Sequence, residues 1–227
     1  MALQTMAAFA AILCMAISYA IETVSWSVRA AAPKGMIGFY VSRSNIFLYF
    51  GRFFTLAYSA LIAVGIERGA NIHYVATVLF CGFFSTSILH FAMILSGRCE
   101  RWLVGTACRL LFIKFDNVRS SRGSISIKGI ITLPTATASL LFSVGITLPL
   151  LIAVIFPAYR LSLSYTGQIV NAAGTLLLLF LVDQRMFRSL DEGRLVEDMP
   201  SYIIGRALAF AAAGSLYLLL YLITMQM

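Results

Sequence analysis

Six long apolar runs are the feature that most restricts what this chain can fold into. Each run is close to the roughly 20 apolar residues that an α-helix needs to cross the hydrocarbon core of a bilayer. In lipid every backbone hydrogen bond must be made internally, and runs of this length make them as helices. The sequence therefore predicts an all-α polytopic membrane protein with six transmembrane helices, at approximately 4–28, 44–66, 71–95, 129–157, 164–182 and 202–224.

The composition agrees with lipid as the main solvent of this chain. Hydrophobic residues make up 60% of the 227 residues and charged residues only 11%, whereas a soluble domain averages about 25% charged residues. The segments between the apolar runs are too short to form a separate soluble domain. We therefore expect residues 1–227 to be a single transmembrane domain.

The basic residues between the runs predict the orientation of the chain. Thirteen Lys and Arg residues lie in or beside the first, third and fifth connections, but only Arg68 and Arg160 lie in the second and fourth. Connections rich in Lys and Arg stay in the cytoplasm, so both termini are expected outside. This asymmetry explains most of the net charge of +8. We therefore expect no nucleic-acid partner, and contacts with anionic membrane lipids instead.

The third connection, 98–128, is predicted to be a basic cytoplasmic loop that begins with a helix. In 98–115, basic residues fall on one helical face and apolar residues supply the remaining surface. This pattern is typical of an amphipathic helix lying at the membrane interface. Its role stays open between an anchor and the capture of an anionic lipid headgroup. The expected basic face holds Arg98, Arg101, Gly105 and Arg109, and the expected apolar surface holds Trp102, Leu103, Leu110 and Phe112.

Charged residues inside the apolar runs point to a polar site. Glu22 and Arg29 are seven residues apart, so on a helix they lie within about 20° of the same face. Asn45 and Arg52 in the second run have the same spacing. Charges within hydrocarbon are costly and by default face the interior of a helix bundle at a functional or structural site.

Three further charged residues belong to the same half of the membrane. Asp183 and Arg185 end the fifth run, and Arg206 opens the sixth. Together these groups predict a cytoplasmic vestibule with excess positive charge, which suits a phosphate-bearing substrate. The alternative is a set of buried ion pairs that fix helix packing, such as Glu22 with Arg52 or Arg206. The candidate substrate-binding residues are Glu22, Arg29, Asn45, Arg52, Asp183, Arg185 and Arg206.

Other polar residues give weaker indications. Gln168 and Asn171 are one turn apart in the fifth run, and we expect them to join helices through hydrogen bonds. The sequence contains no H-E-x-x-H, G-x-S-x-G or P-loop motif. Its four cysteines show no C-x-x-C spacing, so we expect no metal site and no cofactor.

Three patches of the sequence resemble the Amj family, the alternate lipid II flippases of bacteria. Residues 21–29 resemble the first-helix motif of that family, and Asn45 followed by Arg52 resembles its second-helix pattern. Residues 181–185 and 191–193, with Arg206, resemble its C-terminal pattern. Gly51 and Gly205 stand where the family pattern tends to have serine before these arginines.

The resemblance implies a transporter rather than an enzyme. It implies a flippase that moves an undecaprenyl-pyrophosphate-linked peptidoglycan precursor, lipid II, from the cytoplasmic to the outer leaflet of the bacterial inner membrane. Because six spans are few for a carrier of a sugar-linked lipid, we expect a homodimer. Three alternatives stay open: a flippase for another undecaprenyl-linked saccharide, a membrane enzyme acting on polyprenyl phosphates, or a subunit of a membrane complex.

Overall fold

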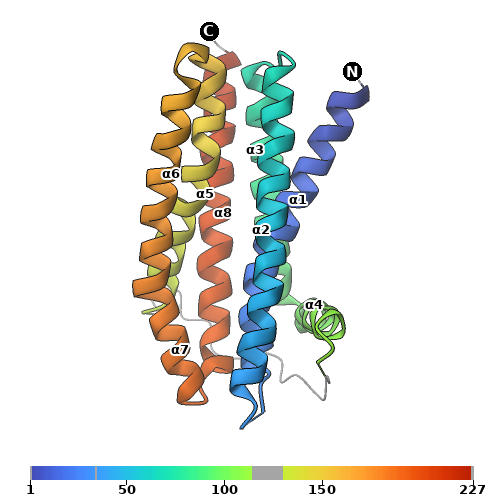
Figure 1. The fold of residues 1–227 in the computed structure, drawn as a ribbon, viewed down its shortest axis with the longest axis vertical. Helices are drawn as coiled ribbons and strands as arrows, with labels where there is room; N and C mark the ends of the chain where they lie inside the picture. Colours follow the sequence, from blue (N-terminus) through green and yellow to red (C-terminus); the bar gives the residue numbers. More distant parts are fainter. Residues whose placement is uncertain (1, 34, 114–129, 226–227) are drawn as a thin grey trace.

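The computed structural model describes residues 2–33, 35–113 and 130–225, and its elements are helices (Figure 1). Six of the helical segments are long and apolar enough to cross a membrane, which confirms the predicted all-α class with six spans. The fifth span is composite and runs from Pro157 to Asp191. The elements are α1 (Ala2–Ala30), α2 (Ile37–Glu67), α3 (Ile72–Leu95), α4 (Gly97–Leu110), α5 (Thr132–Ile155), η1 (Pro157–Tyr159), α6 (Arg160–Leu177), η2 (Leu178–Asp183), α7 (Gln184–Asp191) and α8 (Leu195–Met225).

Several helices extend beyond the predicted spans into more polar sequence. The second begins at Ile37 rather than near 44, and the last begins at Leu195 rather than near 202. Apolar runs mark the part of a helix that lies in hydrocarbon, whereas the helix itself continues into the polar interface. In α8, Glu197 and Asp198 occupy the first turn, where carboxylates interact favourably with the helix dipole.

Proline does not break the fourth span. Pro134 lies in the first turn of α5, where the missing N–H has no intrahelical partner in any case. Pro149 lies inside α5, which nevertheless continues to Ile155. The apolar run 129–157 therefore contains one helix that begins at Thr132.

The six spans form two groups of three. One group contains α1, α2 and α3, and the other contains α5, α6 and α8 (Figure 1). The groups meet chiefly where α3 packs along α8, whereas α2 and α5 touch only weakly. This arrangement leaves a seam between α2 and the α5–α6 pair.

Small residues allow close approach of the helices within the α5–α6–α8 group. A Cβ added at Gly174 of α6 would lie 2.6 Å from the backbone nitrogen of Phe142 in α5. A Cβ added at Gly205 of α8 would lie 2.6 Å from the carbonyl oxygen of Thr132, also in α5. Such close backbone contacts are typical of helices that associate within membranes.

The two ends of the bundle differ. Both termini lie at one end, whereas α4 and α7 lie at the other (Figure 1). An even number of spans places the termini on the same side, as expected. The end that bears α4 and α7 also contains the most basic connections. The charge asymmetry that predicts the orientation is therefore an asymmetry between the two ends of the bundle.

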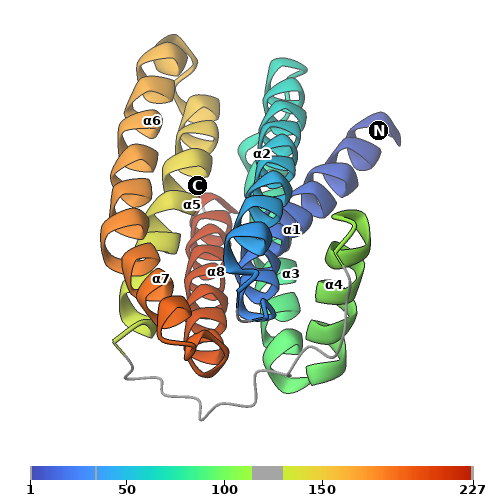
Figure 2. The same ribbon diagram turned by 60° about the horizontal axis from the view of Figure 1, so that its bottom comes forward.

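The predicted amphipathic helix is confirmed as α4. It crosses the long axis of the bundle and appears nearly end-on in Figure 1 and along its length in Figure 2. Its residues Val104 and Cys108 are buried, whereas its residues Arg98, Arg101 and Trp102 are exposed. Gly105 was expected on the basic face but is buried, because the helix turns that position toward α1 and α3. The remainder of the basic loop, 114–128, lies outside the described residues.

Candidate functional site

An ion pair between α1 and α8 lies at the centre of the bundle. Nη2 of Arg206 donates to Oε2 of Glu22 at 2.5 Å. The Arg206 side chain is 2% exposed and that of Glu22 is 16% exposed. Nη1 of Arg206 also donates to the hydroxyl of Tyr202, one turn earlier on α8, at 3.2 Å. The sequence left Arg52 and Arg206 open as partners of Glu22, and in the structure the partner is Arg206.

Aromatic rings surround the Arg206 guanidinium. Its carbon lies 5.2 Å from the ring centroid of Phe210 and 5.9 Å from that of Tyr19. A guanidinium at such distances interacts favourably with the ring face, most strongly where water is excluded. The arginine is thus held by a carboxylate, a hydroxyl and aromatic surfaces together.

Arg29 forms a second buried cationic centre, two turns from Glu22 on α1. Its Nε donates to Oγ of Ser44 at 2.8 Å and its Nη2 donates to Oδ1 of Asn45 at 2.7 Å. The guanidinium lies 4.2 Å from the centroid of Trp26. Arg29 is only 4% exposed, so the α2 groups replace the water that a surface arginine would bind.

Asp183 brings a second carboxylate to these arginines. It is the last residue of η2, a π-helical turn between α6 and α7, and it lies within electrostatic range of Arg29, Glu22 and Arg206. The wider turn of a π-helix changes the register of the side chains, and such turns are frequent at functional sites. Neighbouring Val182 is fully buried although most of α6 is exposed.

The resulting cluster contains two carboxylates and two guanidiniums: Glu22, Asp183, Arg29 and Arg206. Asn45 belongs to it through Arg29. Its formal charges cancel, so the expected excess of positive charge is absent from this site. The four groups come from α1, η2 and α8, which are far apart in the sequence. We refer to these four residues as the charge cluster.

Two of the predicted site residues lie elsewhere. Arg52 is exposed on α2, and its guanidinium carbon is 5.8 Å from the ring centroid of Phe142 in α5. Arg185 donates to the carbonyl oxygen of Ile130, before the start of α5. Among the residues that the structure describes, neither arginine forms an ion pair. Both therefore lie outside the charge cluster.

Buried hydroxyl and imidazole groups extend the cluster into the bundle. Nε2 of His90 lies 2.8 Å from Oγ1 of Thr23, and its Nδ1 lies 2.8 Å from the carbonyl oxygen of Thr86. Because a carbonyl only accepts, the proton of a neutral His90 is on Nδ1. Thr23, Tyr202 and Ser44 were not identified from the sequence; each is adjacent to a charged or amide residue of the site, or one turn from it.

A groove opens at the seam between α2 and the α5–α6 pair. Its volume is about 560 Å³. Gln168 and Asn171 line it, whereas the sequence predicted hydrogen bonds from both to other helices. Within the described part of the chain, the buried Oδ1 of Asn171 has no hydrogen-bond partner. The α5 and α6 backbones are in direct contact there: a Cβ at Gly145 would lie 2.7 Å from the Asn171 nitrogen.

Comparison with known proteins identified no relative of this chain. No protein family, curated protein or solved structure matches the chain. In residues 2–33, 35–113 and 130–225, no three or more His, Cys, Asp or Glu side chains are grouped as a metal site requires. The fold and site together define a multi-pass membrane protein with six candidate spans and a buried, charge-balanced polar centre.

Proposed function

We propose that this chain is a flippase for an undecaprenyl-pyrophosphate-linked precursor, with lipid II as its cargo. It would act in the bacterial inner membrane, with both termini outside and no catalytic residue. One observation supports this proposal above others. Residues from all three patches that resemble the Amj family come together: Glu22 pairs with Arg206, Arg29 donates to Asn45, and Asp183 lies within electrostatic range of both arginines.

The charge cluster is suited to the exchange of anions. In the structure Glu22 neutralises Arg206 at a distance of 2.5 Å. A pyrophosphate presents oxygens that match the planar guanidinium better than one carboxylate oxygen does. We infer that the headgroup displaces Glu22 or Asp183 from the arginines during transport. When the headgroup leaves, the carboxylates return, so neither arginine stays buried without a counter-charge.

The position of the charge cluster fits loading from the cytoplasm. Arg29 lies near the end of α1 that leads to the first basic connection, and Glu22 is about 10 Å further along the helix at 1.5 Å per residue. Glu22 retains partial exposure. In the predicted orientation a headgroup from the cytoplasmic leaflet would therefore reach Arg29 before Arg206.

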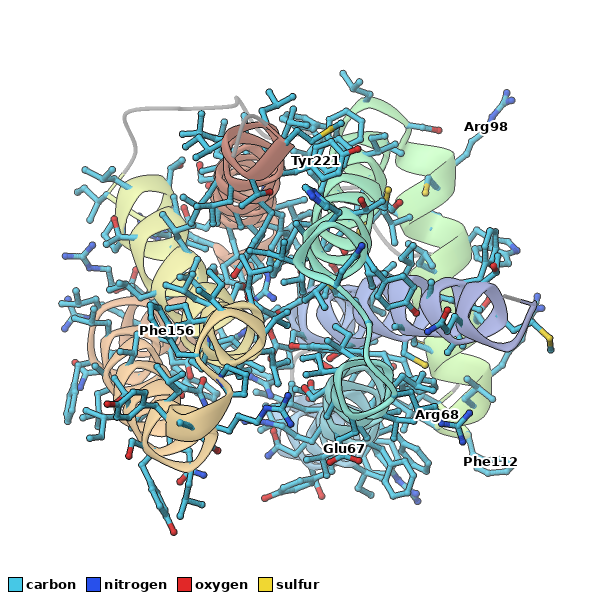
Figure 3. All side chains as sticks on the ribbon, turned by 90° about the horizontal axis from the view of Figure 1, so that it is seen from above. Glu67, Arg68, Arg98, Phe112, Phe156 and Tyr221 are labelled. Atoms are coloured by element: carbon cyan, nitrogen blue, oxygen red, sulfur yellow. The ribbon has the colours of Figure 1, made fainter. Side chains whose placement is uncertain are left out.

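The partners follow from this function. The proposed substrate is a polyprenyl-pyrophosphate lipid, and bulk anionic lipids would contact the basic residues of α4. Arg98 and Phe112 project outward from opposite ends of that segment (Figure 3). A homodimer is also part of the proposal, because six spans enclose little volume around a saccharide headgroup.

Complementation is the direct cellular test. The chain is expressed in a bacterial strain depleted of its known lipid II flippases, and lipid II in the outer leaflet is measured by its accessibility to an external probe. Restored growth with accessible lipid II supports the proposal. Accessibility of a different undecaprenyl-linked saccharide would assign that cargo instead.

Two other outcomes would replace the proposal. Metal-dependent turnover of a polyprenyl phosphate by the pure protein would identify a membrane enzyme. A membrane partner that always co-purifies, together with failed complementation, would identify a subunit of a complex.

A further inference from the structure

The groove between α2 and the α5–α6 pair lies outside the charge cluster. In Figure 3, which views the bundle from above, Glu67 of α2 and Phe156, which follows α5, lie on opposite sides of the seam. Residues of α2, α5 and α6 line the groove, and its volume of about 560 Å³ is within the range of small-molecule sites.

One face of α2 forms a wall of this groove. Leu56, Ser59 and Ala63 all line it. At 100° per residue these positions, together with Arg52, fall within about 60° on a helical projection. Arg52 thus lies on the groove face of α2, one turn before Leu56, with its guanidinium 5.8 Å from the Phe142 ring in α5.

The opposite wall presents polar groups from α6. Gln168 and Asn171 line the groove there. Oδ1 of Asn171 is buried and has no hydrogen-bond partner in the part of the chain that the structure describes. Leaving a buried acceptor without a hydrogen bond is unfavourable. A ligand with hydroxyl or amide donors would satisfy it.

Charges mark both ends of the wall. Glu67 ends α2 and Arg160 begins α6, and both line the groove at the end that bears the termini. Arg52 does not line the groove itself but lies one turn beyond its other end, before Leu56. From Arg52 to Glu67 the face of α2 extends about 22 Å at 1.5 Å per residue. That length covers most of the hydrocarbon core, which is about 30 Å thick.

We propose that this groove binds the saccharide-pyrophosphate headgroup of the lipid-linked substrate and guides it between the leaflets. Arg52 and Arg160 would contact the pyrophosphate toward the inner and outer ends. Gln168 and Asn171 would bind saccharide hydroxyl and amide groups between them. The polyprenyl chain stays in lipid, because the seam is open along α2. This inference rests on the proposed function and adds the route of the headgroup.

The test blocks the groove after the protein has folded. Ser59→Cys is purified, reconstituted with lipid II and then modified with a bulky thiol-specific reagent. Modification should reduce lipid II transfer to the rate of protein-free vesicles, whereas unmodified Ser59→Cys should transfer like the parent. Ala60→Cys is the matched control, because Ala60 is exposed and does not line the groove. The parent protein, treated with the same reagent, controls for the native cysteines.

A second variant tests the polar wall without steric blockage. Asn171→Leu keeps a similar volume but removes Oδ1. Its lipid II transfer should fall roughly tenfold, the effect of losing one hydrogen bond at a binding site. Unchanged transfer in both the fully modified Ser59→Cys protein and Asn171→Leu would overturn the inference and leave the proposed function intact.

Crosslinking separates this inference from the proposed function. A benzophenone attached to the introduced thiol of Ser59→Cys should crosslink to lipid II, and the same group attached to Ala60→Cys should not. Specific crosslinking without any transfer by the parent protein would retain the groove as a binding site and remove the flippase function. Equal crosslinking at both positions would show that the groove contacts bulk lipid only.

Discussion

Glu22 and Arg206 form an ion pair that joins the first and last spans across 184 positions of sequence. The two helices have few other contacts with each other. The pair therefore adds a polar contact between the α1–α2–α3 group and the α5–α6–α8 group, which are otherwise joined chiefly by the packing of α3 along α8. A change in this pair during transport would act directly on how the two groups are held together.

A double-mutant cycle on this pair separates a packing role from a transport role. Glu22→Gln leaves the buried Arg206 without its ion-pair partner, which should cost about 3–5 kcal/mol and lower the membrane level of the protein. The double variant Glu22→Gln/Arg206→Gln should recover its membrane level. It should remain inactive in transport, because the exchangeable anion site is gone.

The exposed pair Glu192–Arg194 provides the control for this cycle. Its side chains are 42% and 62% exposed, and exposed pairs contribute little to stability. Neutralising both residues should change neither membrane level nor transport. Normal transport by the Glu22/Arg206 double variant would mean that the central pair is scaffold.

The Asn45→Ala variant tests whether Asn45 stabilises the buried Arg29 side chain. The variant removes the acceptor of the 2.7 Å bond from Nη2 of Arg29. A hydrogen bond to a charged group contributes about 1.5 kcal/mol or more, so the unfolding temperature in detergent should fall by several degrees. Ser42→Ala, at an exposed position on the same helix, should leave it unchanged. Equal unfolding temperatures for the two variants would contradict the role assigned to Asn45.

Much of the fold follows from sequence patterns, and much of the site does not. The apolar runs give the six spans because helix length is set by bilayer thickness. The seven-residue spacing of Glu22 and Arg29 correctly places them on one inner face of α1. The same spacing in Asn45 and Arg52 identifies a face of α2 but not the helices that this face contacts. Asn45 meets α1, whereas Arg52, about 10 Å along the helix, meets α5.

The sequence placed Asp183 in the candidate site but did not predict the π-helical turn that it ends. This turn consists of five apolar residues followed by Asp183, and it contains no glycine or proline that would mark it in the sequence. Its register depends on how α6 packs on α5. The partner of Glu22 likewise depends on the contact of α8 with α5 at Gly205, which no single-helix pattern reveals.

Arg52→Lys should lose transport while keeping a normal membrane level. Arg52 is exposed and forms no ion pair in the described residues, so folding does not depend on it. Lysine keeps the charge but loses the planar, two-pronged match to phosphate. Arg43→Lys is the control, because Arg43 also lies on α2 over an aromatic ring, 5.4 Å from Phe39. Full transport by Arg52→Lys would remove Arg52 from the headgroup route.

Serine should be tolerated differently at the two glycines that precede Arg52 and Arg206. At Gly205 a Cβ would lie 2.6 Å from the Thr132 carbonyl oxygen, so α8 must move from α5. Overpacking of this kind costs about 1–3 kcal/mol. At Gly51 the nearest atom is Cγ2 of Ile21 at 3.0 Å, and that side chain can adjust. Thermal unfolding should therefore show a clearly larger loss for Gly205→Ser, and equal losses would contradict this packing.

Cysteine labelling tests the orientation. Ser162 and Ser96 are both exposed, near opposite ends of the bundle. In intact cells a membrane-impermeant thiol reagent should label Ser162→Cys but not Ser96→Cys, with the parent protein as the background. The reverse pattern would invert the topology predicted from the basic residues.

The most direct test of transport is the rate at which lipid II crosses between leaflets in vesicles containing only this protein. The parent protein should accelerate the transfer above protein-free vesicles, and the Glu22→Gln/Arg206→Gln variant, reconstituted to the same density, should not. A parent protein no faster than protein-free vesicles would contradict the proposed function. Equal acceleration by the parent and the double variant would contradict the role of the charge cluster in it.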